Sequence, residues 1–173
     1  MYCVGDYVVY SNSGVCRVTA VGVPDCARVD QTRDYYTLTP VYDTETLYVP
    51  VDTTAPIRPA LTKAQAQALI AGMPAIQEEQ LDTRSMQALA EYYRTSFQSQ
   101  DCEGLVRLLK TIHGKDLRAQ ENGGKPGKVD QRYRKRAEDL LHGELAVALE
   151  IPREQVLDYI QSCLEEDSLE TAQ

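Results

Sequence analysis

The residues of this chain best suited to chemistry are lysines and arginines gathered in one stretch. Between Arg107 and Arg136 the sequence holds 10 Lys/Arg and 3 Asp/Glu, whereas the remaining residues hold 8 Lys/Arg and 23 Asp/Glu. The stretch therefore has a net charge of +7 in a chain whose formal net charge is −8. A basic block inside an acidic protein is typical of one face that binds a polyanion. The alternative is a solvated surface on which cations happen to cluster.

These cations surround one Gly-rich loop and the predicted helix ends on both sides of it. Arg132, Lys135 and Arg136 can share one exposed helix face, because spacings of three and four residues return to the same side. Arg134 points elsewhere. Such a group contacts phosphate oxygens and does not read a base sequence. The predicted phosphate-contacting residues are Lys115, Arg118, Lys125, Lys128, Arg132, Lys135 and Arg136.

No pattern in the sequence indicates catalysis. The two histidines, His113 and His142, lie outside any HExxH motif and beside no nucleophile motif. The glycines and lysines of residues 123–128 superficially suggest a phosphate loop, but no hydrophobic strand precedes them and no Ser or Thr follows. The five cysteines form no CxxC pair, which favours reduced thiols over a metal site. We therefore expect a protein that is not an enzyme and that holds neither a metal nor another cofactor.

The elements that must position these residues fall into two parts, of which the first is β-rich. Residues 1–58 contain seven of the eleven tyrosines, and runs of β-branched and aromatic residues alternate with turn residues. Strands so few and short must close or pack on something to cover their edges, which predicts a small, bent antiparallel barrel. The predicted strands are residues 7–10, 15–21, 35–41, 46–51 and 57–58.

The second part is helical, since helix formers dominate from Leu61 onwards. Apolar residues recur there at spacings of three and four, which predicts about five helices. Pro152 suits the first position of the last helix, and the acidic tail after Glu165 is expected to fray. The fold class is therefore α+β, with domains at residues 1–58 and 59–173. The other predicted helices cover 63–72, 84–98, a stretch after Asp101 with Leu105, Leu108, Leu109 and Ile112 as its apolar stripe, and 129–149.

The sequence also bears on localisation. No apolar run approaches the roughly 20 residues that a membrane span needs. The first residues show neither the basic nor the apolar region of a secretory signal. We therefore expect a cytoplasmic protein.

Several stretches, taken in order, resemble one known family. The first part resembles the N-terminal module of CarD/CdnL-type bacterial transcription regulators, which also occurs in the transcription-repair coupling factor. The second part resembles the helical domain of the same regulators. The stretches that carry the resemblance are Val4–Tyr10, the turn at Gly14 and Val15, Tyr35–Leu38, Leu47–Asp52, Ser99–Asp101, Leu105–Lys110 and Arg136–Ala146.

The resemblance implies a function as well as a fold. It implies that residues 1–58 form a Tudor-like RNA-polymerase-interacting domain that docks on the polymerase β subunit. It further implies that the helical domain contacts promoter double-stranded DNA at the upstream edge of the melted region and there stabilises the open complex. Such a regulator is nucleoid-associated. The implied polymerase contacts are Tyr35, Tyr36, Leu47, Tyr48, Val49 and Pro50, and Met86 joins the basic residues as an implied DNA contact.

The sequence departs from the family pattern in two places. Family members commonly carry a Trp that wedges against the minor groove, and this chain has no Trp. The equivalent stretch is Leu81–Met86, where Met86 is the nearest bulky apolar residue able to wedge between bases. Positions that are often basic on the polymerase-facing strands hold residues such as Pro24 and Tyr48.

A second function remains open at this stage, namely a protein-only adaptor. In that role the helical domain binds an acidic protein partner through its basic face, and the Tyr-rich β domain binds another protein. The two functions differ in how binding responds to salt, because phosphate contacts give DNA binding a steep negative salt dependence. The sequence does not show which promoters are affected, or whether the effect is activation or repression.

Overall fold

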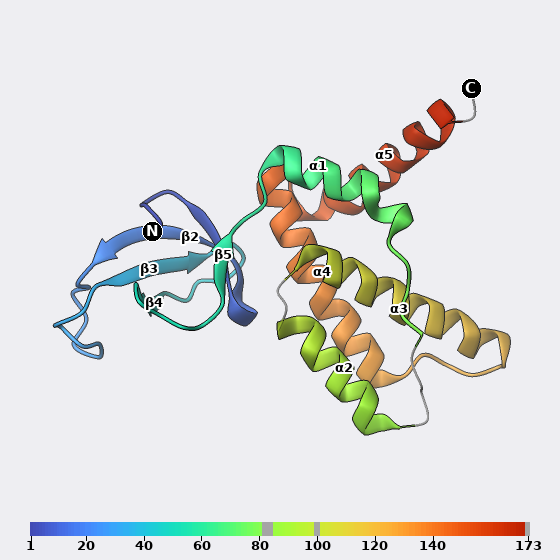
Figure 1. The fold of residues 1–173 in the computed structure, drawn as a ribbon, viewed down its shortest axis with the longest axis horizontal. Helices are drawn as coiled ribbons and strands as arrows, with labels where there is room; N and C mark the ends of the chain where they lie inside the picture. Colours follow the sequence, from blue (N-terminus) through green and yellow to red (C-terminus); the bar gives the residue numbers. More distant parts are fainter. Residues whose placement is uncertain (81–84, 99–100, 172–173) are drawn as a thin grey trace. The chain divides into compact units, whose positions relative to one another are not determined.

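The computed structural model describes the whole chain except residues 81–84, 99–100 and 172–173 (Figure 1). It divides into two compact units, Met1–Ala60 and Leu61–Gln173. The first unit is an antiparallel β-sheet and the second is built of helices, so the predicted α+β class is confirmed. That each unit is an independent domain stays a prediction.

The first unit is a five-stranded sheet with the strand order β4-β3-β2-β1-β5. A single 3-10 turn, Ser11–Ser13, connects the first two strands and ends at Gly14, whose φ of 72° favours glycine. In β2 the register shifts between Val18 and Ala20, which indicates a bulge. The strands are β1 Tyr7–Tyr10, β2 Gly14–Gly22, β3 Tyr35–Pro40, β4 Leu47–Pro50 and β5 Ile57–Pro59.

The sheet is open, because among the described residues no pairing joins its two edge strands, β4 and β5. The closed barrel that we expected is therefore not formed. Both edge strands are short and both end in proline, at Pro50 and Pro59, which has no N–H to donate to a ladder. Too few donors thus remain to close the sheet. The Tudor-like identity of this unit stays a prediction.

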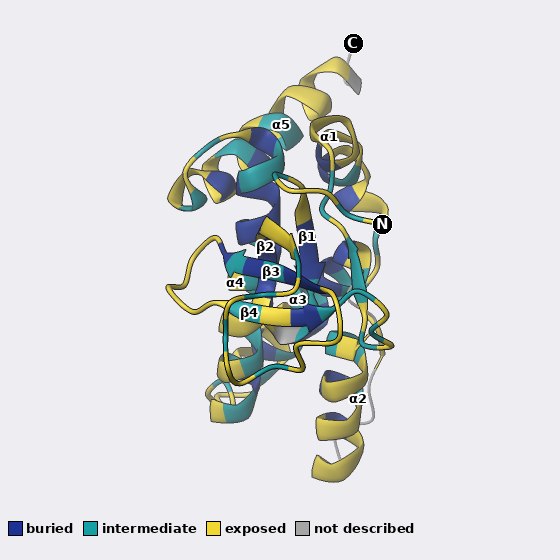
Figure 2. Cartoon of the chain, turned by 90° about the vertical axis from the view of Figure 1, so that its left-hand side faces the viewer, coloured by how far each residue is buried: buried dark blue, intermediate teal, exposed yellow. Residues whose placement is uncertain are grey.

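One face of the sheet forms the core of the first unit. Tyr2, Tyr10 and Ile57 lie against this core at its margins. Burial raises the pKa of the Cys16 thiol to about 11, so this cysteine is a protonated core residue. Figure 2 shows the buried residues of β1 and β3 in dark blue. The fully buried members of the core are Val8, Cys16, Val18, Tyr36, Leu38 and Val49.

The second unit contains the five helices that the apolar spacing predicted. Their inward faces share one apolar core, in which Tyr93, Leu108, Ile112 and Leu145 are fully buried. The predicted start of the second helix, Arg84, lies outside the described residues. The helices are α1 Lys63–Gly72, α2 Met86–Gln98, α3 Cys102–Glu121, α4 Lys128–Leu149 and α5 Val156–Thr171.

The last helix differs from its prediction in three respects. Pro152 precedes a 3-10 turn, Arg153–Gln155, and α5 begins only at Val156. Leu157 is spaced three and seven residues from Ile160 and Leu164, which predicts an inward position, but it is 52% exposed, since it lies about 100° around the helix from the buried Val156. The acidic tail does not fray at Glu165, because α5 continues to Thr171.

Removing the cap of α1 tests how the helical unit begins. The Thr62 hydroxyl accepts a hydrogen bond from the Gln65 N–H at 3.2 Å, and the Gln65 side chain accepts from the Thr62 N–H at 2.9 Å. We expect Thr62→Ala to lower the free energy of unfolding by about 1 kcal/mol, because the Gln65 N–H loses its acceptor. Urea unfolding of the full chain, followed by helical circular dichroism, measures this loss. Thr54→Ala, in an exposed loop of the first unit, is the control, and an equal loss in both variants would contradict the capping role.

Candidate nucleic-acid interface and docking edge

At least half of the basic block is used inside the helical unit. Of the 10 Lys/Arg between Arg107 and Arg136, at least five bind carboxylates or main-chain carbonyls of the same unit. These contacts stabilise the packing of helices and leave fewer cations for a partner. The five interactions are Arg107 with Glu103, Lys110 with the carbonyls of Met73 and Ile76, Lys115 with Asp130, Arg118 with Glu78, and Arg134 with Asp116 and Glu138.

Two of the predicted phosphate contacts, Lys115 and Arg118, are among these internal cations. The Lys115 Nζ lies 2.8 Å from Oδ2 of the buried Asp130, and only 25% of the Lys115 side chain is exposed. Arg118 Nη1 lies 2.9 Å from Glu78 Oε1 at the surface. Both side chains therefore have carboxylate partners inside the helical unit.

The remaining predicted cations form a row, which we call the basic stripe: Lys125, Lys128, Arg132 and Lys135. All four are exposed, and among the described residues no ion pair joins them to a carboxylate. Within α4, spacings of four and three residues place Lys128, Arg132 and Lys135 on one side of the helix, and Lys125 lies in the loop just before it. From Lys128 to Lys135 the row is about 10 Å long.

Arg136 lies beside the basic stripe but contacts α2. Its guanidinium lies 5.8 Å from the centroid of the Phe97 ring, a cation–π distance. Phe97 also packs on Tyr133, with ring centroids 5.6 Å apart. The structure therefore brings Arg136 and the basic stripe together on α4, with Arg136 held at the border of the stripe.

Met86, the implied wedge, is the first residue of α2 and is 71% exposed. Helix α2 runs alongside α4 in the same direction, since Tyr93 contacts Asp130 and Phe97 contacts Tyr133. Both helices therefore begin at the same end of the unit, as Figure 1 shows. This end carries Met86 together with Lys125 and Lys128. Residues 81–84 of the implied wedge stretch lie outside the described residues.

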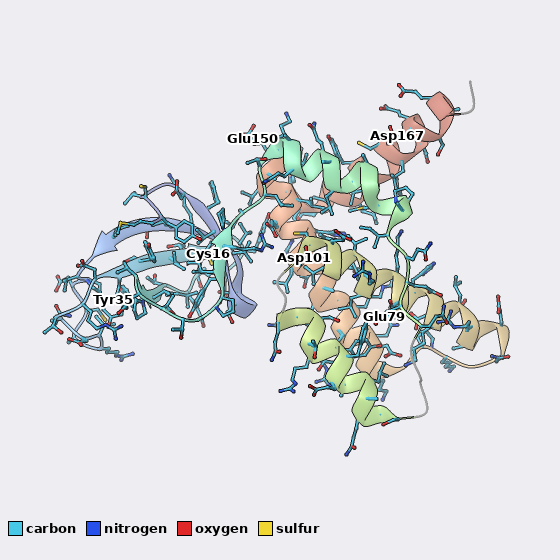
Figure 3. The ribbon with its side chains drawn as sticks, in the orientation of Figure 1. Cys16, Tyr35, Glu79, Asp101, Glu150 and Asp167 are labelled. Carbon is cyan, nitrogen blue, oxygen red and sulfur yellow. The ribbon has the colours of Figure 1, made fainter. Side chains whose placement is uncertain are left out.

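The predicted polymerase contacts are divided between the core and the surface. The side chains of Tyr35, Tyr36 and Val49 are buried in the first unit, with at most 7% exposed. Tyr35 (Figure 3) also accepts a hydrogen bond at its hydroxyl from the Asp30 N–H at 3.3 Å. These three side chains therefore hold the sheet together. Leu47, Tyr48 and Pro50 remain as predicted side-chain contacts with the polymerase, and Tyr48 is exposed.

The main chain of β4 offers a docking edge. In an antiparallel pair, residues that exchange hydrogen bonds across the ladder alternate with residues that do not. Val51 N–H donates to the Asp34 carbonyl at 3.1 Å, so in this register Val49 and Leu47 also face β3. Tyr48 is opposite Thr37 and belongs to the other set. Its N–H and C=O therefore point away from β3, at the outer side of the sheet.

The opposite edge, β5, is less suited to pairing. Pro59 has no N–H, and its carbonyl accepts from Arg58 Nη1 at 3.2 Å. The Ile57 carbonyl accepts from the Tyr2 hydroxyl at 3.5 Å. Prolines and local hydrogen bonds are common ways of blocking an edge strand. The open edge is therefore β4, centred on Tyr48.

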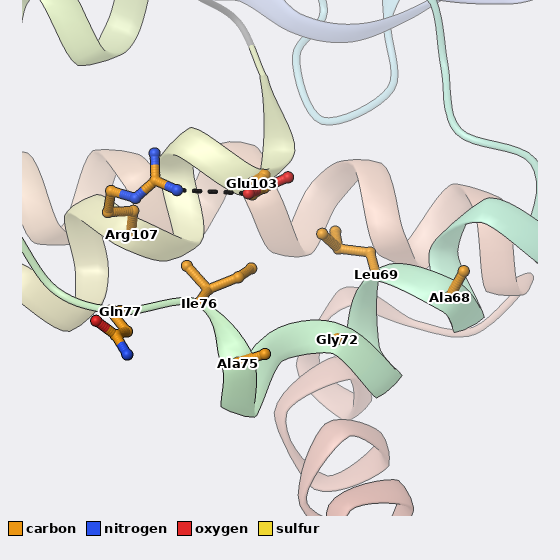
Figure 4. Close-up of a pocket in the computed structure, with 8 residues that line it drawn as sticks. All are labelled: Ala68, Leu69, Gly72, Ala75, Ile76, Gln77, Glu103 and Arg107. Carbon is orange, nitrogen blue, oxygen red and sulfur yellow. Dashed lines mark hydrogen bonds and ion pairs between the residues drawn. The ribbon is translucent and has the colours of Figure 1, made fainter.

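The helical unit also has a groove between α1 and the start of α3 (Figure 4). Its volume is about 460 Å³, and small or aliphatic residues form most of its wall. Its polar groups are Gln77 and the ion pair of Arg107 with Glu103, at 3.4 Å. Nothing in this set forms a nucleophile with a base. Within the described part of the chain, no group of three or more His, Cys, Asp or Glu is placed to hold a metal ion.

Comparison with known proteins agrees with the first unit. Residues 2–61 match the family of CarD-like/TRCF RID domains, the RNA-polymerase-interacting domains, so the resemblance of this unit is confirmed. The match supports a CarD-like, RNA-polymerase-interacting protein. It covers about a third of the chain, and the likeness of the helical unit to the same regulators stays a prediction. No curated protein matches the chain. Among the described helices, none is long and apolar enough to cross a membrane.

Proposed function

We propose that this chain is a non-enzymatic transcription regulator of the CarD type. Its first unit, a Tudor-like module in this proposal, docks on the β subunit of RNA polymerase. Its helical unit contacts promoter DNA at the upstream edge of the melted region and modulates the stability of the open complex. The observation that carries the proposal is the match of residues 2–61 to the polymerase-interacting family. In this role the protein works in the cytoplasm, on the nucleoid.

Docking by strand addition is supported by the open edge of β4. A strand of the partner can pair there through the N–H and C=O of Tyr48, which point away from β3. Main-chain hydrogen bonds of this kind need no basic side chains on the strand, which fits the presence of Tyr48 at a position that is often basic in the family. The exposed Tyr48 ring adds contact area, as tyrosines commonly do at protein interfaces.

Contact with DNA is supported by the basic stripe. Its cations follow one another along about 10 Å of α4, which suits successive phosphates of a backbone. At a net charge of −8 the chain as a whole repels DNA, so the stripe alone gives weak binding. Docking on the polymerase solves this problem, because it holds the stripe at a high effective concentration beside the promoter. In this arrangement Met86 is the residue placed to wedge against the minor groove.

The test of this function uses the full chain and bacterial RNA polymerase. We expect saturable binding to the core enzyme by calorimetry, and a changed lifetime of the promoter open complex when the chain is added. Polymerase binding with an unchanged lifetime at every promoter tested would favour the protein-only adaptor, with the stripe facing an acidic partner. Absence of polymerase binding would refute the docking role itself.

A further inference from the structure

Two crossed ion pairs join α3 to α4 on the side of α4 that packs inward. Lys115 Nζ lies 2.8 Å from Asp130 Oδ2, and Arg134 Nη1 lies 3.8 Å from Asp116 Oδ2. Helix α3 supplies a cation followed at once by a carboxylate. Helix α4 supplies a carboxylate and, one turn later, a cation. Each helix therefore presents both signs of charge to the other.

The two carboxylates are buried and fully engaged. Asp130 is 3% exposed and Asp116 is 6% exposed. Asp130 accepts a second hydrogen bond from the Tyr93 hydroxyl of α2, and Asp116 accepts one from Gln131 Nε2 at 3.0 Å. Burial, and then the Asp130 carboxylate, raise the pKa of Tyr93, so its hydroxyl stays a donor. A buried carboxylate that loses its cation is strongly unfavourable, which makes these pairs selective.

The crossed arrangement fixes how α4 lies on α3. If α4 slid by one turn, Arg134 would take the place of Asp130 and face Lys115, a contact between like charges. The best-attested role of buried charged groups is to exclude alternative registers between packed elements. The same half of α4 carries the basic stripe on its exposed side, so the register and rotation of α4 decide where the stripe points.

We propose that Lys115 and Asp130 form a positioning pair. The pair orients the basic stripe toward the DNA phosphates, and neither residue contacts a phosphate itself. This inference rests on the proposed DNA contact and deepens it. It also replaces the role that the sequence predicted for Lys115, which was direct contact with phosphate. Lys115 acts through Asp130, and Asp130 acts through the orientation of α4.

A double variant separates the two roles of Lys115. Lys115→Met leaves Asp130 buried without its cation, whereas Lys115→Met with Asp130→Asn removes the charge on both sides. If Lys115 positions α4, the second substitution restores what the first one lost. If Lys115 touches a phosphate, the second substitution restores nothing, because the lost cation is not replaced.

The measurement is binding of the full chain to a duplex DNA oligonucleotide by fluorescence anisotropy over a range of salt concentrations. We expect Lys115→Met to weaken binding by roughly fivefold to tenfold, and the double variant to return to within about twofold of the unmodified chain, with its salt slope recovered. Equal weakening in both variants, with the salt slope lower by about 0.9 in each, would overturn the proposal in favour of a phosphate contact. Unchanged binding in Lys115→Met would overturn it too.

Amide hydrogen exchange gives a readout that does not depend on DNA. We expect Lys115→Met to speed exchange in the first half of α4 while α1 and α5 keep their protection, and the double variant to slow it again. Arg107→Met is the matched control, because it removes an exposed ion pair from the same helix, α3. Because the chain alone is expected to bind weakly, the titrations start at low salt and extend to high protein concentration; absence of duplex binding even there would refute the proposed DNA contact. In that case unchanged exchange in α4 would refute the positioning pair, and faster exchange would support it.

Discussion

Tyr48→Pro is expected to weaken binding to RNA polymerase by roughly 30- to 150-fold, about 2–3 kcal/mol. The Tyr48 N–H points away from β3, so proline removes a donor from the docking edge and places its ring where a partner strand would lie. The bonds to β3 come from the neighbouring residues Leu47 and Val49, so the sheet keeps its ladder. Proline is tolerated at such outward positions of edge strands. Calorimetry with the core enzyme measures the loss.

Tyr48→Ala is the matched control for this substitution. Alanine removes the exposed ring but keeps the N–H and C=O of the edge, so it separates side-chain contact from strand addition. We expect it to weaken binding by less than about tenfold, as loss of one exposed interface side chain usually does. If alanine and proline had equal effects, the ring would be the contact and strand addition at β4 would be refuted. Unchanged circular dichroism in both variants verifies that the chain remains folded.

Reversing the charge of Lys128, Arg132 and Lys135 to Glu is expected to weaken duplex binding by about 10²- to 10³-fold near 0.1 M salt. These three exposed residues of α4 have no carboxylate partner among the described residues, so the change removes phosphate contacts without breaking an ion pair found there. Each lost contact lowers the salt slope by about 0.9, or about 2.7 for three. Anisotropy titrations at several salt concentrations give both quantities.

A second triple reversal controls for the change in total charge. Arg17, Arg28 and Lys63 are exposed and lie outside α4, and their reversal alters the net charge by the same amount. We expect this control to weaken binding only slightly, through general repulsion that salt screens. A control variant as weak as the stripe variant would show that net charge, and not the stripe, governs binding. For the open complex, the stripe variant should also shorten promoter-complex lifetime without loss of polymerase binding.

The periodicity of the sequence was sufficient to predict the elements of both units. Alternating Tyr, Val and Thr residues predicted all five strands, and apolar spacings of three and four predicted all five helices, because these patterns report directly on local geometry. Thr62 and Asp101 cap α1 and α3, and both are residue types that favour this position. Periodicity does not show which residues of a short element face the core. Leu157 shows this, since it has the spacing of the apolar stripe but lies on the exposed side of α5, next to the buried Val156.

The site was harder to predict, because it depends on pairs that are distant in sequence. Lys115 is engaged by Asp130 and Arg118 by Glu78, 40 residues away, and spacing along one helix cannot reveal such partners. Adjacent tyrosines in a strand point to opposite faces, yet both Tyr35 and Tyr36 are buried, so alternation did not tell which was available to a partner. Closure of the sheet depends on whether its two edge strands pair, and these strands are too short for their periodicity to predict this.

The short open edge also bears on how the protein behaves when it is concentrated. Unprotected edge strands let identical chains pair with one another and aggregate. At β4 the outward hydrogen-bonding groups end at Pro50, which has no N–H and whose carbonyl already accepts from Thr53 at 3.0 Å. Two copies meeting edge to edge would thus gain few bonds, too little for a lasting homodimer. We therefore expect this edge to pair with a partner that adds contacts beyond the strand itself, and not with a second copy of the chain through the edge alone.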